Sequence, residues 1–283
     1  MAQLCKPIME GGLNMTDTMD TAAGRWIEPR EGFEYATDTV VVSAAYQAEK
    51  LRACGIDPTL FGSTVDASFF IGLAIRAGVA SGISAEGNVN MLQSLVQHRP
   101  AALDEPLTVR GSITAVTTVP RGRTIDTDVW FEDASGARVI TARRRSLKPD
   151  PEKGTRGAGE RPPPVVTEPG AARVLARHQL TPEIVLSYSE EGNSIHYDLE
   201  AAQRAGFRAP LIGGGMGVHY LLAALCAERP PERFDLDIYF RRPIFWDDAF
   251  EVVLTPADDA MALIRREGED IKVLTEARIN GIG

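Results

Sequence analysis

One stretch in the last third of the chain is more informative than any other. It runs Tyr188-Ser189-Glu190-Glu191-Gly192-Asn193-Ser194-Ile195-His196-Tyr197-Asp198 and continues through Ala205-Gly206-Phe207 to Pro210-Leu211-Ile212-Gly213-Gly214-Gly215-Met216. Glu191 stands five residues before His196, and a carboxylate with an imidazole is the usual proton-transfer pair at neutral pH. Clustered glycines let backbone N–H groups approach a substrate closely, as an oxyanion site requires. The stretch therefore predicts an acid–base site beside a glycine-rich loop.

This stretch resembles the hydratase motif of the MaoC-like dehydratase and (R)-specific enoyl-CoA hydratase family. That motif runs roughly Ser-Gly-Asp-x-Asn-Pro-Ile-His, then Ala-x-x-x-Gly-Phe, then Ile-x-His-Gly-Met. The positions that carry the same or a similar residue here are Asn193, Ile195, His196, Gly206, Phe207, Pro210, Gly215 and Met216. Three positions depart from the motif: Glu191 stands at the catalytic Asp, Ser194 at the Pro and Gly214 at the second His. Because one departure falls on the catalytic position, the resemblance predicts the fold more strongly than the activity.

The resemblance implies a specific reaction. In the family, the carboxylate and the histidine hold one water over the face of a trans-2-enoyl thioester, and they correspond here to Glu191 and His196. The backbone N–H of Gly215 would bind the thioester oxygen. The residues expected to shape the site are Asn193, Ser194, Gly214 and Met216, and the missing side chain at Gly214 predicts a more open cleft there. No metal or redox cofactor is expected, since CoA is part of the substrate.

Three alternatives to this hydratase interpretation stay open. Acidic residues and Asn also stabilise helix N-termini, which would explain Glu190, Glu191 and Asn193 without catalysis. A hot-dog thioesterase could use Glu191 alone to activate water against the carbonyl carbon. A catalytically silent acyl-CoA-binding or partner subunit would do neither reaction, because fold only weakly determines function.

Composition limits the class of protein. The chain has 283 residues, of which 44% are hydrophobic and 24% charged, as is typical of a globular protein with room for two domains. It has no apolar run long enough to span a bilayer and no signal-peptide pattern at its start. Three widely spaced cysteines, Cys5, Cys54 and Cys226, indicate reduced thiols. We therefore expect a cytoplasmic location.

The net charge of the chain limits the kinds of ligand that it is expected to bind. A net charge of −9 argues against nucleic-acid binding, which needs a basic surface. An acyl-CoA thioester could still bind a local basic patch, since guanidinium groups match phosphate geometry. The candidates near the motif are Arg204, Arg208, Arg241 and Arg242. No membrane partner is expected, and a homodimer is compatible with the sequence.

An internal repeat divides the chain. The twelve residues from His98 to Val109 align without gaps on those from Arg241 to Val252, with Arg-Pro, an acidic residue and alternating apolar positions in common. Between the copies, residues 149–168 are rich in Pro and Gly, the composition of a linker. The predicted organisation is a flexible arm over 1–29, a hot-dog subdomain without the motif over 30–148, the linker over 149–168, and a second subdomain with the motif over 169–283.

Each half is expected to contain helices followed by antiparallel strands, an α+β arrangement. Helices are predicted over 44–53, 68–80, 199–205 and 217–227. Strands are predicted over 89–98, 107–119, 124–132, 138–147, 184–188, 236–241, 249–255, 261–267 and 272–280. With the motif, this order resembles the hot-dog fold, in which a curved sheet wraps a central helix. The fold class is therefore expected to be a double hot-dog.

Two other histidines, His98 and His219, are not expected to take part in proton transfer. His98 has no carboxylate near it in the sequence like the Glu191 that precedes His196. It is expected to be structural, because a histidine without a carboxylate partner makes no proton relay. His219 lies three residues after Met216 and is interpreted as a partly buried residue of the central helix.

Overall fold

The structure is a computed structural model and describes residues 26–153, 162–189, 193–228 and 230–283. Residues 1–25 of the predicted arm and 154–161 of the predicted linker lie outside this range. So do Glu190, Glu191 and Gly192, and thus one member of the predicted catalytic pair.

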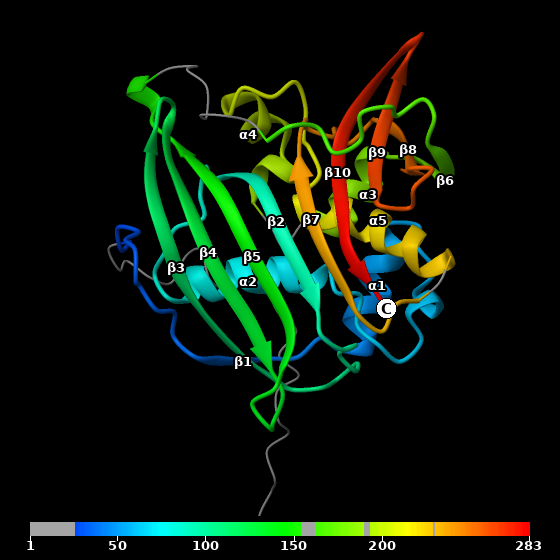
Figure 1. Ribbon diagram of the computed structural model, residues 1–283. Coiled ribbons are helices and arrows are strands. Elements are labelled where there is room, and N and C mark those ends of the chain that lie inside the picture. Colours follow the sequence, from blue (N-terminus) through cyan, green and yellow to red (C-terminus); the bar gives the residue numbers. More distant parts are fainter. Residues whose placement is uncertain (1–25, 154–161, 190–192, 229) are drawn as a thin grey trace, which may run out of the picture.

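The described strands form one continuous ten-stranded sheet (Figure 1) in the order β1-β3-β4-β5-β2-β7-β10-β9-β8-β6. All the pairings are antiparallel, and β2 and β7 join the two halves at the centre. The two halves have matching strand orders. Counted outward from the centre, β2, β5, β4, β3 and β1 of the first half correspond to β7, β10, β9, β8 and β6 of the second. The strands are β1 (Asp38–Val40), β2 (Val89–Gln97), β3 (Leu107–Val119), β4 (Gly122–Glu132), β5 (Arg138–Pro149), β6 (Arg173–Gln179), β7 (Phe234–Phe240), β8 (Ala249–Leu254), β9 (Ala260–Glu267) and β10 (Asp270–Ile282).

Two central helices, α2 and α5, pack on the same side of this sheet (Figure 1). Both are apolar along most of their length and contribute to one core cluster that spans both halves of the chain. A helix that is apolar on most sides must be buried on most sides, which is why the sheet curves around it. The helices are α1 (Ala44–Ala53), α2 (Phe69–Ala80), α3 (Pro182–Ser189), α4 (Leu199–Arg204) and α5 (Gly214–Glu228), with short 3-10 turns η2 (Pro58–Phe61), η3 (Pro151–Lys153) and η4 (Ser194–His196).

The repeated Arg-Pro segments have the same local structure. In the first, the Glu105 carboxylate accepts a hydrogen bond from the Ala102 N–H at 2.9 Å. In the second, Asp248 accepts from the Phe245 N–H at 2.8 Å, at the aligned position. Each segment follows one of the two central strands, β2 or β7. The predicted α+β double hot-dog class is confirmed by the repeat, the single sheet and the two central helices.

One segment that was predicted to be a strand is a helix. Residues 184–188 were expected to be a strand because Ile184, Val185 and Leu186 form an apolar run, but they belong to helix α3. The start signals of a helix stand just before them: the Thr181 hydroxyl accepts from the Ile184 N–H at 3.3 Å, and Pro182 opens the helix. The edge strands β1 and β6 were not predicted.

Candidate functional site

His196 is held in one orientation by the main chain. It ends the 3-10 turn η4, and its Nδ1 lies 2.7 Å from the carbonyl oxygen of Leu211. Because a carbonyl can only accept, Nδ1 carries the proton and Nε2 keeps a free lone pair. Burial lowers the pKa of His196, and the bond to Leu211 opposes that shift in part. The ring is therefore a neutral base at pH 7.

The glycine-rich loop faces this ring. A Cβ atom placed on Gly213 would lie 3.6 Å from His196 Nε2, so the free nitrogen points at the loop. Helix α5 begins at the next residue, Gly214, which is three residues before the start predicted from the sequence. The first N–H groups of a helix have no partner inside it and carry a partial positive charge. No hydrogen bond from the Gly215 N–H to a described acceptor is present.

Gly214 does not leave an open space. A Cβ atom there would lie 2.9 Å from the Phe240 ring and 3.2 Å from Nδ2 of Asn90. The expectation of a more open cleft at this position was wrong, because Phe240 and Asn90 occupy the room that a larger residue would need. Both come from the two central strands, β7 and β2.

The other predicted site-shaping residues have different environments. Asn193 caps η4, and its side chain accepts from the Ile195 N–H at 3.3 Å. Ser194 is exposed on the same turn. Met216 is fully buried in the core, so it supports the loop from below. His98 contacts Thr141 at the end of β2, far along the strand from the Gly214 neighbour Asn90.

A buried polar network holds the end of helix α3, which precedes Glu190 in the motif. Nδ1 of His219 lies 2.6 Å from Oδ2 of Asp66, and its Nε2 lies 2.7 Å from the Tyr188 hydroxyl. Ser68 bonds to both Asp66 and His219. Asp66 and His219 are both fully buried. Tyr188 is near the end of α3, two residues before Glu190, so the network ties this end of α3 to the first half.

His219 was expected to be a partly buried residue of the central helix, but it is fully buried and bonds to Asp66 and Tyr188. Asp66 lies in the first half, 153 positions from His219, and nothing local marks it as a partner. The only sequence signal was a lone acidic residue immediately before an apolar helix.

The four arginine candidates for CoA phosphates are not equally available. Arg208 pairs with Asp247 and Asp248 and lies over the Phe245 ring. Arg241 pairs with the buried Glu276 and donates to the carbonyl oxygens of Pro162 and Pro163. Arg204 pairs with Glu200, and Arg242 donates to the Val273 carbonyl oxygen. Arg204 and Arg242 are exposed and keep donors for a ligand more readily than the two that hold buried acids.

Comparison with known proteins supports the fold. No protein-family model and no curated protein matches the sequence. Among solved structures, HtdX from Mycobacterium tuberculosis is 19% identical, with a TM-score of 0.70 over 87% of this chain and 99% of that one. A MaoC-like dehydratase from Phytophthora capsici is 17% identical, with a TM-score of 0.64 over 87% and 95%. A putative oleoyl thioesterase from Lactobacillus plantarum is 13% identical, with a TM-score of 0.52 over 87% and 94%.

These similarities show that the chain has the fold of MaoC-like dehydratases, and a further similar structure is described as a double hotdog. They do not separate dehydratase from thioesterase chemistry, because both occur on this fold. None of the helices in the described part of the chain is long and apolar enough to cross a membrane. The described residues also contain no cluster of metal-ligating side chains.

Proposed function

We propose that this protein adds water to a 2-enoyl thioester, or removes it from the corresponding 3-hydroxyacyl thioester. The observation that carries the proposal is the orientation of His196: its Nδ1 proton is used by Leu211, and its free Nε2 faces the loop at the start of α5. An imidazole that is neutral at pH 7 is available to take a proton from water.

The reaction needs three groups. A water held by His196 and Glu191 gives one proton to Nε2 of His196 as its oxygen bonds to Cβ, and the electron pair of the Cα=Cβ bond moves toward the thioester carbonyl. The protonated His196 then gives that proton to Cα, so that one water is added across the double bond. The thioester oxygen gains negative charge during this step. The Gly215 N–H, at the positive end of α5, is the proposed donor to that oxygen. Glu191 is one methylene longer than the aspartate at this position of the motif.

The fold similarity to MaoC-like dehydratases agrees with this chemistry, and acyl-CoA thioesters are the substrate class that the motif implies. A thioesterase is the second candidate, since a protein of this fold is described as one. The two reactions differ in the bond that forms: hydration leaves the thioester intact, whereas hydrolysis releases a free thiol.

The test is a spectrophotometric screen of enoyl-CoA esters that differ in length and branching, with thiol detection in parallel. We expect loss of the conjugated enoyl absorbance without thiol release, and loss of that activity in His196→Ala. His98→Ala is the matched control, because the His98 ring bonds to the Thr141 hydroxyl beyond the end of β2, remote from the loop. Thiol release that tracks enoyl consumption would instead show a thioesterase.

A further inference from the structure

Asn90, from the first half of the chain, lies against the glycine loop of the second half. Its Nδ2 atom is 3.2 Å from the position that a Cβ atom would take on Gly214. Gly214 stands where the hydratase motif has its second histidine. The Asn90 carboxamide and the Phe240 ring therefore occupy the space into which a histidine side chain would extend. A polar group of the first half lies where the motif of the second half has lost one.

A β-bulge turns Asn90 toward this loop. The register of β2 against β5 shifts at this point, because Asn90 is opposite Ser146 whereas Leu92 is opposite Arg145. In a regular strand, Asn90 and Leu92 would point to the same face of the sheet. The extra residue, Met91, reverses the alternation, so Leu92 shares the outer face with the exposed Arg145 and Asn90 points inward.

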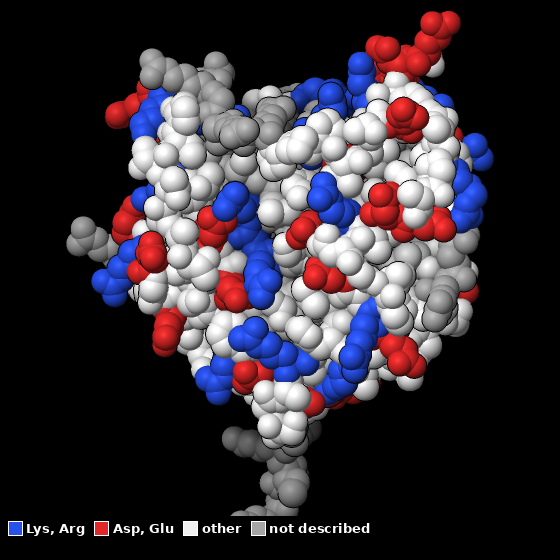
Figure 2. Space-filling view, viewed as in Figure 1, with Lys and Arg blue, Asp and Glu red and all other residues white. Residues whose placement is uncertain are grey.

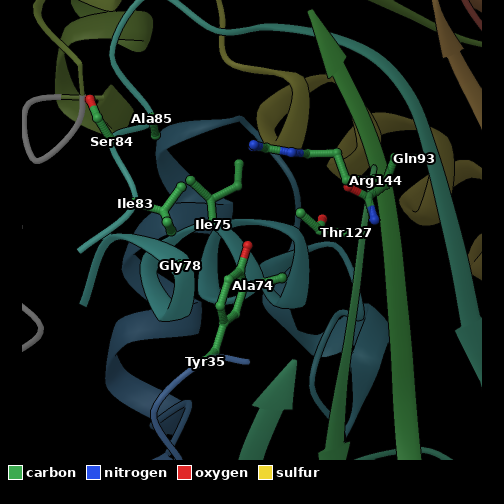
Figure 3. Close-up of a pocket in the computed structure, with 10 residues that line it drawn as sticks. All are labelled: Tyr35, Ala74, Ile75, Gly78, Ile83, Ser84, Ala85, Gln93, Thr127 and Arg144. Carbon is green, nitrogen blue, oxygen red and sulfur yellow. The ribbon is translucent and has the colours of Figure 1, made fainter. Parts of the chain in front are cut away.

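The two faces of the sheet differ here. On the outer face, basic and acidic side chains are interspersed (Figure 2), and Arg145 pairs there with Asp126. On the inner face, Gln93 of β2 and Arg144 of β5 are cross-strand partners (Figure 3). The cavity that they help to line has a volume of about 20 Å³, enough for one water. A substrate at the glycine loop must therefore be bound at the near end of β2, where Asn90 lies.

The Asn90 carboxamide is available to a ligand. Its side chain has no hydrogen-bonding partner among the described residues, and it is half-buried. A polar group that is partly withdrawn from water without such a partner costs free energy, so it favours binding of a ligand that provides one. The neighbouring Gly215 N–H also lacks a described acceptor. Two free donors, one from each half of the chain, thus lie side by side at the start of α5.

We propose that Asn90 is a further catalytic residue, whose NH2 group donates a hydrogen bond to the thioester oxygen together with the Gly215 N–H. The identity of this substrate rests on the proposed function. As the water oxygen bonds to Cβ, the electron pair of the double bond moves toward the thioester carbonyl, and its oxygen gains negative charge. A donor that is already in place stabilises this charge. The amide transfers no proton, and the charge is lost when Cα takes up its proton.

The kinetic experiment compares the wild type with Asn90→Ala and Asn90→Asp on 2-enoyl-CoA esters. The second variant is nearly isosteric, so it keeps the packing against Phe240 but replaces the donor by an oxygen. We expect kcat to fall about a hundredfold in both variants with KM nearly unchanged, because the donor acts mainly on the charge of the transition state. Asn280→Ala is the matched control and should keep kcat, since that carboxamide bonds to Asp235 and Asp237 on the outer face.

Infrared spectroscopy tests the hydrogen bond without turnover. Saturated butanoyl-CoA with ¹³C in its carbonyl group is bound to the full chain, and a hydrogen bond to the carbonyl oxygen lowers its stretching frequency. We expect a lower frequency in the wild type than in Asn90→Ala, with equal thermal unfolding temperatures. Equal frequencies in the two proteins would overturn the inference, whatever the rates.

The kinetic outcomes separate this inference from the proposed function. Hydration at an unchanged kcat in both Asn90 variants would overturn the donor role and leave the proposed reaction standing. Thiol release by the wild type that falls about a hundredfold in Asn90→Ala would uphold the donor role and refute hydration, because hydrolysis also places negative charge on the thioester oxygen.

Discussion

Nδ1 of His219 lies 2.6 Å from Oδ2 of Asp66, and this contact joins the two halves of the chain inside the core. The Asp66 carboxylate also accepts from the backbone N–H and the hydroxyl of Ser68, at the start of α2. On the other side of the ring, His219 contacts the Tyr188 hydroxyl near the end of α3. The first half thus has no motif of its own but contributes the anchor for the segment that precedes Glu191.

Loss of this anchor should be costly. Asp66→Ala removes one partner of a buried, hydrogen-bonded pair and leaves His219 and Ser68 unsatisfied. We expect the free energy of unfolding to fall by about 3 kcal/mol. Urea denaturation measures it, with Asp270→Ala as the control, because Asp270 forms an exposed pair with Lys272. Equal, small effects of the two substitutions would contradict the anchoring role.

The protonation of His196 makes a prediction about pH. Its pKa is lowered below the ordinary value of 6.5, chiefly by burial. The neutral base should therefore persist to lower pH, and its ring resonances should titrate below 6.5 in NMR spectra, assigned by their absence in His196→Gln. Since the unfolded chain binds this proton more readily, the stability contributed by His196 is present above 6.5 and is lost as the pH falls toward the lowered pKa. A midpoint above 6.5 would be inconsistent with a half-buried ring that is neutral at pH 7.

The glycine loop offers a matched pair of substitutions. Gly214→Ala would place a methyl group 2.9 Å from the Phe240 ring, whereas Gly215→Ala meets nothing closer than the Ser68 carbonyl at 4.0 Å. We expect Gly214→Ala to lower stability by about 1–3 kcal/mol and to reduce activity, as overpacking does. Gly215→Ala should keep both, because the backbone N–H is retained. If Gly214→Ala and Gly215→Ala changed the thermal unfolding temperature and the rate of enoyl hydration to the same extent, the packing described for this loop would be wrong.

Substitutions of the neighbouring residues Arg241 and Arg242 should have different effects, the first on stability and the second at most on CoA affinity. Arg241 bonds the fully buried Glu276, which also accepts from the N–H groups of Val165 and Val166. Arg241→Met should therefore lower the free energy of unfolding by about 3 kcal/mol, as expected for a broken buried pair. Arg242 is exposed, so Arg242→Met should leave stability unchanged and act, if at all, on the affinity for CoA measured by calorimetry. The reverse pattern would restore Arg241 as a phosphate ligand.

The parts of the fold that were predicted are those with a local signal. The Arg-Pro repeat marked both central strands, and its acidic residues, Glu105 and Asp248, make the same bond in each half. The apolar run after Ser68 marked α2. Residues 184–188 were assigned wrongly because an apolar run of that length fits either a strand or a helix, and the helix-start residues Thr181 and Pro182 decide between them.

The candidate site was only partly predictable for a different reason. His196 and the glycine loop stand in one motif, so their proximity follows from the sequence. Asp66, Phe240 and Asn90 come from distant elements that meet only when the two halves form one sheet.

Hydration can be followed directly by incubation of the protein with an enoyl-CoA ester in ¹⁸O-labelled water and mass spectrometry of the acyl products. We expect one ¹⁸O atom in the hydroxyl group of an intact 3-hydroxyacyl thioester, and no such product with His196→Ala. Label found only in a released carboxylate, together with free CoA, would contradict the proposed hydration.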